Sequence, residues 1–544
     1  MKNIKIYLFA ILALTFVIQS CDEDVALLAQ LEEENPLPGE VTGTSGNLNL
    51  SKYVAIGNSL TAGFMDNALY TSGQAHSFPN LLAQQFQISG IGGGAFNQPD
   101  IGSANGFSGT DGTNIFGRLE LSLSLLRPVP TVGELPTPYG GDKAALNNFG
   151  VPGMRLVDVA DAGLAARNGL YGRFASQPGV STVLGDALAA NPTFFSFWLG
   201  TNDILGYAVG GGANEALITS AGAFQASLTQ ALGGLVQSGA QGVVMTIPQI
   251  ILAPFFRAVP HNAIPMTDQA TVDQLNGAFA GLNAALDGLA GFQLLTVEQA
   301  NARKVSYALG ANPILMYDDA LADIGPLFDA LLGAGAISAA QRAALDPYRQ
   351  SRPATSSDLP TLSAAASLGQ PLVVGGVPQP TAVIGVSYPA PDNLILSASE
   401  VQTVVGTRAT FNATISGVVA GINQSAPGAL TLVDVQPTFV DLAGLDAATA
   451  RFLVDPTNGA NAALAAMGNA AVAAVDGELG IRVDGVNLAP DFSPNGVFST
   501  DGVHLNPRGY AIVANLIIDA LNASKGSSIP SVNVLALRGV ITTD

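Results

Sequence analysis

Short apolar segments that stop at glycine- or proline-containing turns constrain the fold of this chain most strongly. Segments so short and so apolar are typical of strands that are buried on both faces, as in a parallel sheet. The four segments are 53–56, 194–198, 242–246 and 430–435.

Helical patterns lie between and after these segments. In 510–521 the apolar residues recur at offsets of 3, 4, 7 and 11, which places them on one helical face. Residues 397–400 fit a capping box ahead of a helix that runs towards Ala420, and 268–289 favours another helix. Strands that alternate with helices predict an α/β fold with three layers, α/β/α, around a central parallel sheet.

The chain of 544 residues is expected to form one large domain, from 49 to 525. A segment from about 302 to 395 interrupts the pattern of strands and helices, and we interpret it as an insertion of helices and loops within that domain. Residues 334–345 are expected to be helical, and a stretch rich in Pro, Gly and Ser follows from Pro353 to Pro389. Residues 526–544 are expected to form a C-terminal tail.

The N-terminus has the pattern of a targeting segment. Basic residues in the first five positions precede an apolar run from Ile6 to Ile18, which predicts a signal peptide over 1–20. The segment Val17–Cys21 resembles a bacterial lipobox, whose cysteine is lipidated, and Cys21 is the only cysteine of the chain. Lipidation of Cys21, followed by a flexible tether over 21–48, predicts a lipid-anchored protein of the outer membrane or cell surface. The acidic run Asp22–Asp24 resembles a surface-export signal, and a merely solvated tether is the alternative.

Composition excludes several classes of function. The formal net charge is -20, so binding to nucleic acid is not expected. With a single cysteine, the chain cannot form an internal disulfide, and three histidines are too few for a typical multi-histidine metal site. We therefore expect neither a metal nor a cofactor. The sequence does not indicate an oligomeric state.

Four short motifs carry groups suited to acyl transfer. A serine, Ser59, stands in a glycine-containing turn directly after the first strand, where open α/β sheets bind ligands. Asn148–Gly153 contains glycines that allow close approach of the backbone. Asn202 follows the second strand and can donate a hydrogen bond. Near the end, Asp501 and His504 are three residues apart, so the carboxylate can orient the imidazole.

Together these motifs resemble the SGNH/GDSL hydrolase family, in the same order along the chain. The resemblance covers about 50–255 and 395–525. It implies that Ser59 is a nucleophile, that His504 is its general base, and that Asp501 orients His504. It further implies an oxyanion hole formed by Ser59, Gly153 and Asn202, with Gly150 as the alternative glycine. The lipobox, the insertion and the tail resemble lipoproteins of this family from Bacteroidetes.

The chain departs from the family at one position: Asn58 stands where the family usually has Asp. This departure removes no catalytic group but alters a neighbouring polar contact. His76 and His261 lack an acidic partner at the spacing of Asp501, and we assign them surface or structural roles. An α/β-hydrolase is disfavoured because the chain contains no Gly-x-Ser-x-Gly.

The resemblance implies a carboxylic ester hydrolase, and several alternatives stay open. The substrate is expected to be a lipid, a short-chain acyl ester or an acetylated glycan. A non-catalytic lipoprotein that binds lipid or glycan is the rival class. The apolar residues from Ile324 to Leu332 are candidates for a lid or for a packing layer. Phe255 and Phe256 are candidates for an acyl pocket or for the core.

Overall fold

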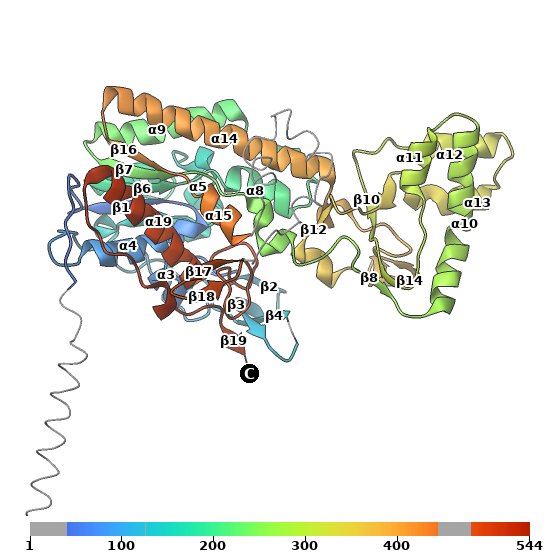
Figure 1. Cartoon of the computed structure of the whole chain (residues 1–544), viewed down its shortest axis with the longest axis horizontal. Helices are drawn as coiled ribbons and strands as arrows, with labels where there is room; N and C mark the ends of the chain where they lie inside the picture. Colours follow the sequence, from blue (N-terminus) through green and yellow to red (C-terminus); the bar gives the residue numbers. More distant parts are fainter. Residues whose placement is uncertain (1–40, 126, 444–479, 544) are drawn as a thin grey trace, which may run out of the picture.

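The computed structural model describes residues 41–125, 127–443 and 480–543. The expected signal peptide, Cys21 and the tether up to residue 40 lie outside these residues. A five-stranded sheet, parallel throughout, forms the centre of the larger body (Figure 1). Its strands are β1 (Tyr53–Gly57), β5 (Asn148–Gly150), β6 (Phe194–Trp198), β7 (Gln241–Met245) and β16 (Leu430–Val433). The four predicted strands are confirmed, and β5 is an addition.

The strand order gives the sheet a switch point. Across the sheet the strands stand β5-β1-β6-β7-β16, which is 2-1-3-4-5 by their order along the chain. In a sheet of this order the connections leave β1 and β6 in opposite directions, so a crevice opens at the carboxyl ends of these two strands. The loops that follow β1 and β6 therefore meet at the place where ligands usually bind.

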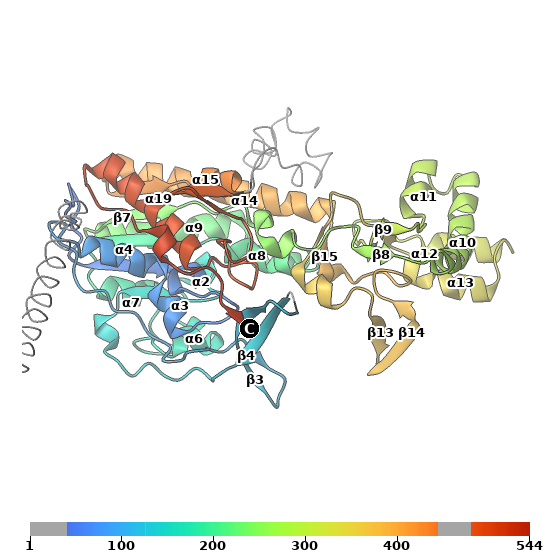
Figure 2. The same ribbon diagram turned by 60° about the horizontal axis from the view of Figure 1, so that its bottom comes forward.

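Helices cover both faces of the sheet, which confirms the expected α/β layering (Figures 1 and 2). Helices α4 (Phe78–Phe86) and α19 (Pro507–Lys525) pack together on one face, and α9 (Ala221–Gln237) packs with α14 (Ala398–Ser425) on the other. The predicted helix at 510–521 lies inside α19. The capping box expected at 397–400 is present, with hydrogen bonds in both directions between Ser397 and Glu400.

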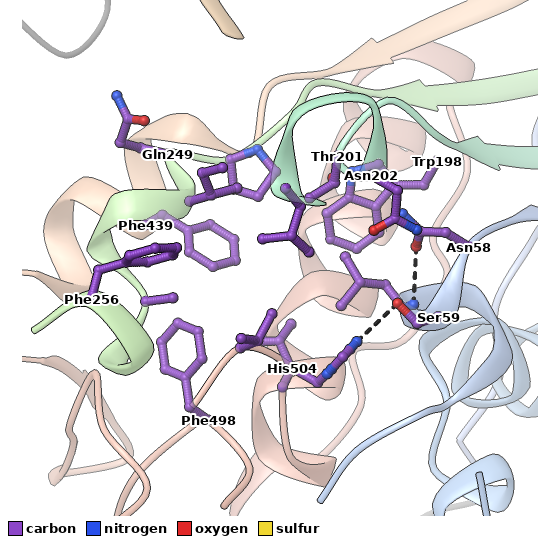
Figure 3. Close-up of a pocket in the computed structure, with 17 residues that line it drawn as sticks. Asn58, Ser59, Trp198, Thr201, Asn202, Gln249, Phe256, Phe439, Phe498 and His504 are labelled. Carbon is purple, nitrogen blue, oxygen red and sulfur yellow. Dashed lines mark hydrogen bonds between the residues drawn. The ribbon is translucent and has the colours of Figure 1, made fainter. Parts of the chain in front are cut away.

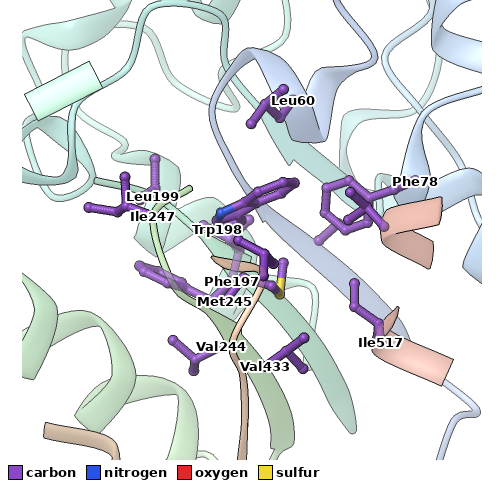
Figure 4. Close-up of a cluster of buried hydrophobic side chains, with 14 of the residues drawn as sticks. Leu60, Phe78, Phe197, Trp198, Leu199, Val244, Met245, Ile247, Val433 and Ile517 are labelled. Carbon is purple, nitrogen blue, oxygen red and sulfur yellow. The ribbon is translucent and has the colours of Figure 1, made fainter. Parts of the chain in front are cut away.

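The core of this body lies between the layers, and it explains why the strands are so apolar. Every residue of β1 and β6 is buried. Their side chains contact helix residues on one side or the other, as the Trp198 ring does beside the Phe78 ring of α4, with ring centroids 5.6 Å apart (Figure 4). Burial of a side chain of this size contributes about 1.5–3 kcal/mol relative to leaving it exposed.

Residues 264–395 form a second body with its own hydrophobic core, at one end of the long axis (Figure 1). Its long helix α10 (Gln269–Gly291) is the predicted helix at 268–289, capped by Asp268. Since α10 packs into this second core, the insertion begins near Ile264, and the predicted start at about 302 was too late. The apolar face of α10 was visible in the sequence, but the face alone did not show which core it joins.

The second body contains three further helices and four antiparallel strand pairs. The helix expected at 334–345 is confirmed only in its second part: α12 ends before Ala334, and α13 starts at Ala339. The helices are α11 (Val297–Arg303), α12 (Gly325–Gly333) and α13 (Ala339–Leu345). The strand pairs are β8 (Ile264–Met266) with β9 (Gly310–Asn312), β10 (Leu315–Tyr317) with β11 (Ser351–Pro353), β12 (Leu359–Pro360) with β15 (Ile395–Leu396), and β13 (Pro371–Val374) with β14 (Val377–Val383).

The C-terminal segment packs against the larger body. Ile529, Val532 and Val534 are buried in its core, and β19 (Thr542–Thr543) pairs with β3 (Ile115–Ser122). The predicted separate tail is therefore part of the folded domain. Strands β2 (Gly109–Thr110) and β4 (Arg127–Val132) complete this small sheet. The domain also begins slightly before the predicted start at 49, because Leu48 is buried and the Gly43 N–H donates to the Ser89 carbonyl.

Short elements make the remaining connections. They are α2 (Ser59–Ala62), α3 (Thr71–Ala75), α5 (Leu164–Arg167), α6 (Gly169–Gly172), α7 (Val183–Ala189), α8 (Asn202–Val209), α15 (Gln436–Leu442), β17 (Ile481–Val483) and β18 (Val486–Leu488). Among the described residues, no helix has the length and apolar character needed to cross a bilayer.

Candidate active site

Ser59 lies at the switch point, at the first position of α2, directly after β1. Asn58 caps this helix: its Oδ1 accepts a hydrogen bond from the Leu60 N–H at 3.0 Å. An amide oxygen caps a helix as well as a carboxylate does. The departure at Asn58 therefore preserves a hydrogen bond that fixes the turn bearing Ser59.

Asp501 and His504 meet Ser59 from the loop that precedes α19. The His504 Nε2 lies 2.9 Å from the Ser59 Oγ, and the His504 Nδ1 lies 2.9 Å from the Asp501 Oδ2. The structure thus brings together the three residues predicted from the sequence. Ser59 and His504, which are 445 residues apart in the chain, face each other in Figure 3.

Four donors surround the Asp501 carboxylate. Oδ1 accepts from the N–H groups of Val503 and His504, both at 2.8 Å. Oδ2 accepts from the Asn67 N–H at 2.9 Å and faces the His504 ring. Burial alone would raise the pKa of Asp501, but the charge of His504 and these hydrogen bonds outweigh burial and hold that pKa well below its ordinary value. Asp501 is therefore ionised at neutral pH.

An ionised Asp501 fixes the tautomer of His504. The carboxylate can only accept, so Nδ1 of a neutral imidazole carries the proton and Nε2 is left as the acceptor towards the Ser59 hydroxyl. The ring of Phe64 packs against the imidazole, with centroids 4.8 Å apart, and the Tyr510 hydroxyl donates to the Phe64 carbonyl at 2.7 Å. These contacts hold the imidazole in the orientation in which it can remove a proton from Ser59.

The turn that contains Gly153 lies between the loops of Ser59 and Asn202. The Val151 N–H donates to the Gly57 carbonyl at 2.9 Å, and the Asn202 Nδ2 donates to the Met154 carbonyl at 3.0 Å. Gly153 has φ +78, a conformation that favours glycine. Its N–H, like that of Ser59, makes no hydrogen bond to any residue that the structure describes.

Gly150 has a different role. Its N–H donates to the Asn148 side chain at 2.9 Å, and a Cβ at this position would lie 2.3 Å from the Ala62 nitrogen. Gly150 therefore permits close packing of β5 against α2, while its N–H is already engaged. Of the two candidate glycines, Gly153 is the one with an N–H available to a ligand.

Asp203 lies next to Asn202 in the first turn of α8. It is fully buried, and its Oδ2 accepts from the Leu156 N–H at 2.7 Å, which ties α8 to the segment after Gly153. Burial raises the pKa of Asp203 to about 6, against the opposing effect of this hydrogen bond.

A mainly apolar pocket opens beside Ser59, with about 590 Å³ of space, part of it continuous with solvent. Polar groups of Ser59, Asn202 and His504 lie at one end, and the rings of Phe256, Phe439 and Phe498 lie at the other (Figure 3). The remaining lining residues are Asn58, Leu60, Trp198, Thr201, Leu205, Pro248, Gln249, Ile250, Ala253, Val503 and Leu505. A pocket of this composition suits an apolar group with a polar reacting end.

The proposed lid is a packing layer instead. Ile324, Phe328 and Leu331 are buried in the core of the second body, and within the described residues they do not line the pocket. Phe256, by contrast, does line the pocket, while the neighbouring Phe255 packs against the main core. An apolar stretch in the sequence did not reveal which surface it would cover.

Four residues of the site were not predicted from the sequence. They are Phe439 and Phe498 in the pocket wall, and Asn67 and Phe64 around Asp501 and His504. Phe439 and Phe498 lie far from Ser59 in the chain, and no spacing pattern connects them. The only signal was proximity in sequence: Phe64 follows the Ser59 turn, and Phe498 lies six residues before His504.

Two further histidines and a group of three carboxylates lie outside the Ser59 pocket. Neither His76 nor His261, both in the described part of the chain, lines the pocket. One group of three carboxylates among the described residues, Asp319, Asp392 and Glu400, has ligand atoms within 4.8 Å of one another, as a cation would require. It lies outside the Ser59 pocket, at the junction with the second body.

A scan against protein-family models, and searches of curated proteins and of solved structures, give no match to this chain.

Proposed function

We propose that the protein is a serine hydrolase of the SGNH/GDSL type that cleaves carboxylic esters. The observation that carries the proposal is the continuous hydrogen-bonded arrangement of Ser59, His504 and Asp501 at the switch point of the sheet. A serine within hydrogen-bond distance of a base, with a third group orienting that base, is the arrangement that activates a serine nucleophile.

The reaction proceeds in two halves. In the first, the Ser59 Oγ attacks the ester carbonyl carbon while His504 Nε2 takes the hydroxyl proton. The bond to the alcohol oxygen then breaks, and Nε2 returns the proton to the leaving alcohol. In the second half, water attacks the acyl-enzyme and gives its proton to Nε2. The bond between the acyl carbon and the Ser59 Oγ then breaks, Nε2 returns the proton to that oxygen, and the carboxylic acid leaves.

The negative charge that develops on the carbonyl oxygen needs donors. The N–H groups of Ser59 and Gly153 are unpaired among the described residues, and the Asn202 Nδ2 carries a second hydrogen besides the one that it donates to Met154. These three groups form the proposed oxyanion hole. One such donor typically contributes about 10²–10³ in rate.

The pocket supports an ester whose acyl group is apolar. Its aromatic end would leave sugar hydroxyls without hydrogen-bond partners, at a cost of about 1–3 kcal/mol each. A lipid or a short-chain acyl ester therefore fits better than a glycan in this pocket. An acetylated glycan remains compatible only if its sugar stays outside and the acetyl group alone enters.

Lipidation of Cys21 and a location at the outer membrane or cell surface remain part of the proposal. They rest on the sequence pattern around the only cysteine. Growth with labelled palmitate, followed by immunoprecipitation, should label the wild type and not Cys21→Ala. Equal labelling of both proteins would contradict the anchor.

The activity is tested with p-nitrophenyl esters from acetate to decanoate. We expect Ser59-dependent hydrolysis that is fastest for acyl chains longer than acetate. Ser59→Ala and His504→Gln should lose the activity, whereas His261→Gln, a control at one of the two histidines outside the pocket, should keep it. If wild type and Ser59→Ala hydrolyse every ester equally slowly, the protein is not an esterase, and the non-catalytic lipoprotein that binds lipid or glycan becomes the better account.

A further inference from the structure

Asp66 is a buried carboxylate that the proposed reaction does not use. It lies seven residues after Ser59 and is 1% exposed. Its Oδ1 accepts from both the N–H and the hydroxyl of Thr500, at 3.0 and 2.8 Å. Its Oδ2 accepts from the Tyr70 hydroxyl at 2.6 Å. A buried carboxylate that is so fully paired fixes the elements that supply its donors.

The main chain around Asp66 contacts the same segment. The Asp66 N–H donates to the Ser499 Oγ at 3.0 Å, and the N–H of the next residue, Asn67, donates to the Asp501 Oδ2. Both residues have positive φ, 54 for Asp66 and 61 for Asn67. This uncommon conformation turns both N–H groups towards the loop of Asp501. A two-residue turn after the nucleophile thus contacts three consecutive residues, 499 to 501.

We propose that Asp66 is a positioning residue, which holds the Asp501–His504 loop at hydrogen-bond distance from Ser59. The inference rests on the proposed function of that site. The loop and the Ser59 turn come from opposite ends of the chain, and Asp66 with Asn67 joins them by hydrogen bonds around the reacting groups. A displacement of a catalytic group by about 1 Å can cost 10²-fold in rate.

The C-terminal segment takes part in this arrangement. The Arg538 Nη2 donates to the Tyr70 hydroxyl at 2.9 Å, so that the hydroxyl accepts from Arg538 while it donates to Asp66. Tyr70 is fully buried. The segment that was predicted to be a tail therefore orients the donor of Asp66. Two hydrogen bonds connect Arg538 to Asp66, and a third connects Asp66 to Thr500 in the active-site loop.

Single hydrogen bonds can be removed without a change of shape. Tyr70→Phe removes the donor to Oδ2, and Thr500→Val removes the hydroxyl donor to Oδ1. Thr500→Ser keeps that hydroxyl. Tyr53→Phe is a matched control, because its buried hydroxyl bonds to the Ser196 Oγ at 2.8 Å at the start of β1, away from the carboxyl end of the sheet.

Two readouts are measured on each folded variant. The first is kcat and KM for p-nitrophenyl butyrate at a temperature well below each Tm. The second is the proton resonance of the His504 Nδ1–H in protein labelled with ¹⁵N-histidine, which does not depend on turnover. We expect Tyr70→Phe and Thr500→Val to lower kcat about 10- to 100-fold with little change in KM, and to shift or broaden this resonance. Thr500→Ser and Tyr53→Phe should match the wild type in both.

The outcomes separate this inference from the proposed function. Unchanged kcat and an unchanged resonance in Tyr70→Phe and Thr500→Val would overturn the positioning role. An equal loss in Tyr53→Phe would also overturn it, because the effect would then follow general stability. If the wild type has no Ser59-dependent activity, the proposed function fails, and the resonance alone decides whether Asp66 positions the loop.

Discussion

Replacement of Asp501 by Asn changes the hydrogen-bond chemistry of the site with almost no change of shape. The Asp501 Oδ1 accepts from two backbone N–H groups, and Oδ2 accepts from the Asn67 N–H and faces the His504 Nδ1. An Asn side chain has only one oxygen for these two pairs of donors. If that oxygen accepts from the N–H groups of Val503 and His504, the NH₂ group faces the His504 Nδ1.

This NH₂ group would force the wrong tautomer. Nδ1 would become the acceptor, and Nε2 would carry the proton and point it at the Ser59 Oγ. His504 could then no longer take the proton of Ser59. Loss of the correct tautomer in serine hydrolases costs about 10⁴ in kcat, which corresponds to about 5.4 kcal/mol at 1.36 kcal/mol per tenfold.

The assay is kcat for p-nitrophenyl butyrate, together with the Tm of each variant. Asp491→Asn is the matched control, because its Oδ1 also accepts a backbone N–H, from Ser493 at 2.9 Å, in the same region of the chain. The double variant Ser59→Ala with Asp501→Asn should be no slower than Ser59→Ala alone, because groups that act as a unit are not additive. If kcat of a folded Asp501→Asn variant falls less than tenfold, Asp501 does not set the tautomer of His504.

Three further predictions concern the oxyanion hole, the pocket and the junction between the bodies. Asn202→Ala should lower kcat about 10²–10³-fold with a small change in KM, and an unchanged kcat would remove Asn202 from the oxyanion hole. Phe439→Leu replaces a ring at the far end of the pocket with a smaller side chain and so leaves more room for a long acyl chain. The ratio of kcat/KM for decanoate to kcat/KM for butyrate should therefore rise about tenfold; an unchanged ratio would show that the acyl chain does not reach Phe439. Burial and the neighbouring Asp392 raise the pKa of Glu400 from 4.5 to about 7, although hydrogen bonds with Ser397 oppose this shift. The contribution of Glu400 to stability is therefore greatest below pH 4.5 and is lost as the pH rises through 7. Glu400→Gln keeps a side chain suited to the capping box but cannot titrate. Its Tm should therefore fall less between pH 5 and pH 8 than the Tm of the wild type, and parallel curves of Tm against pH for the two proteins would contradict the raised pKa of Glu400.

The central sheet was predictable because its strands are buried on both faces. Such strands must be apolar along their whole length, as 194–198 is, and that pattern survives in the sequence. Strand β5 has three residues, too few for a pattern, and it was found only as a glycine-containing motif. The helices α10, α14 and α19 were predicted because each has an apolar face, a cap or both.

It was also predictable from the sequence that the motifs of the site lie close together, for a related reason. In a parallel sheet the carboxyl ends of the strands share one edge, so motifs placed directly after strands must lie close together. The pocket walls were not predictable in this way. Phe439 and Phe498 reach the pocket through tertiary packing between distant segments. The role of Asp66 depends on partners in the loop of Asp501, which lie more than 430 residues away in the chain.

The sequence likewise did not show which part of the fold an apolar segment packs against. Residues 324–332 could cover a pocket or a core with the same sequence, and the structure places Ile324, Phe328 and Leu331 in the core of the second body. The C-terminal segment looked like a tail because its strand β19 has only two residues, too few for a pattern in the sequence. Its buried Ile529, Val532 and Val534 make it part of the domain.

Covalent labelling of Ser59 tests the central proposal most directly. A fluorophosphonate forms a stable bond with an activated serine, and peptide mass spectrometry locates the modified residue. We expect a single adduct on the peptide that contains Ser59, formed in parallel with loss of esterase activity, and absent from Ser59→Ala and from His504→Gln. Labelling of another residue, or no labelling of a folded protein, would contradict the account.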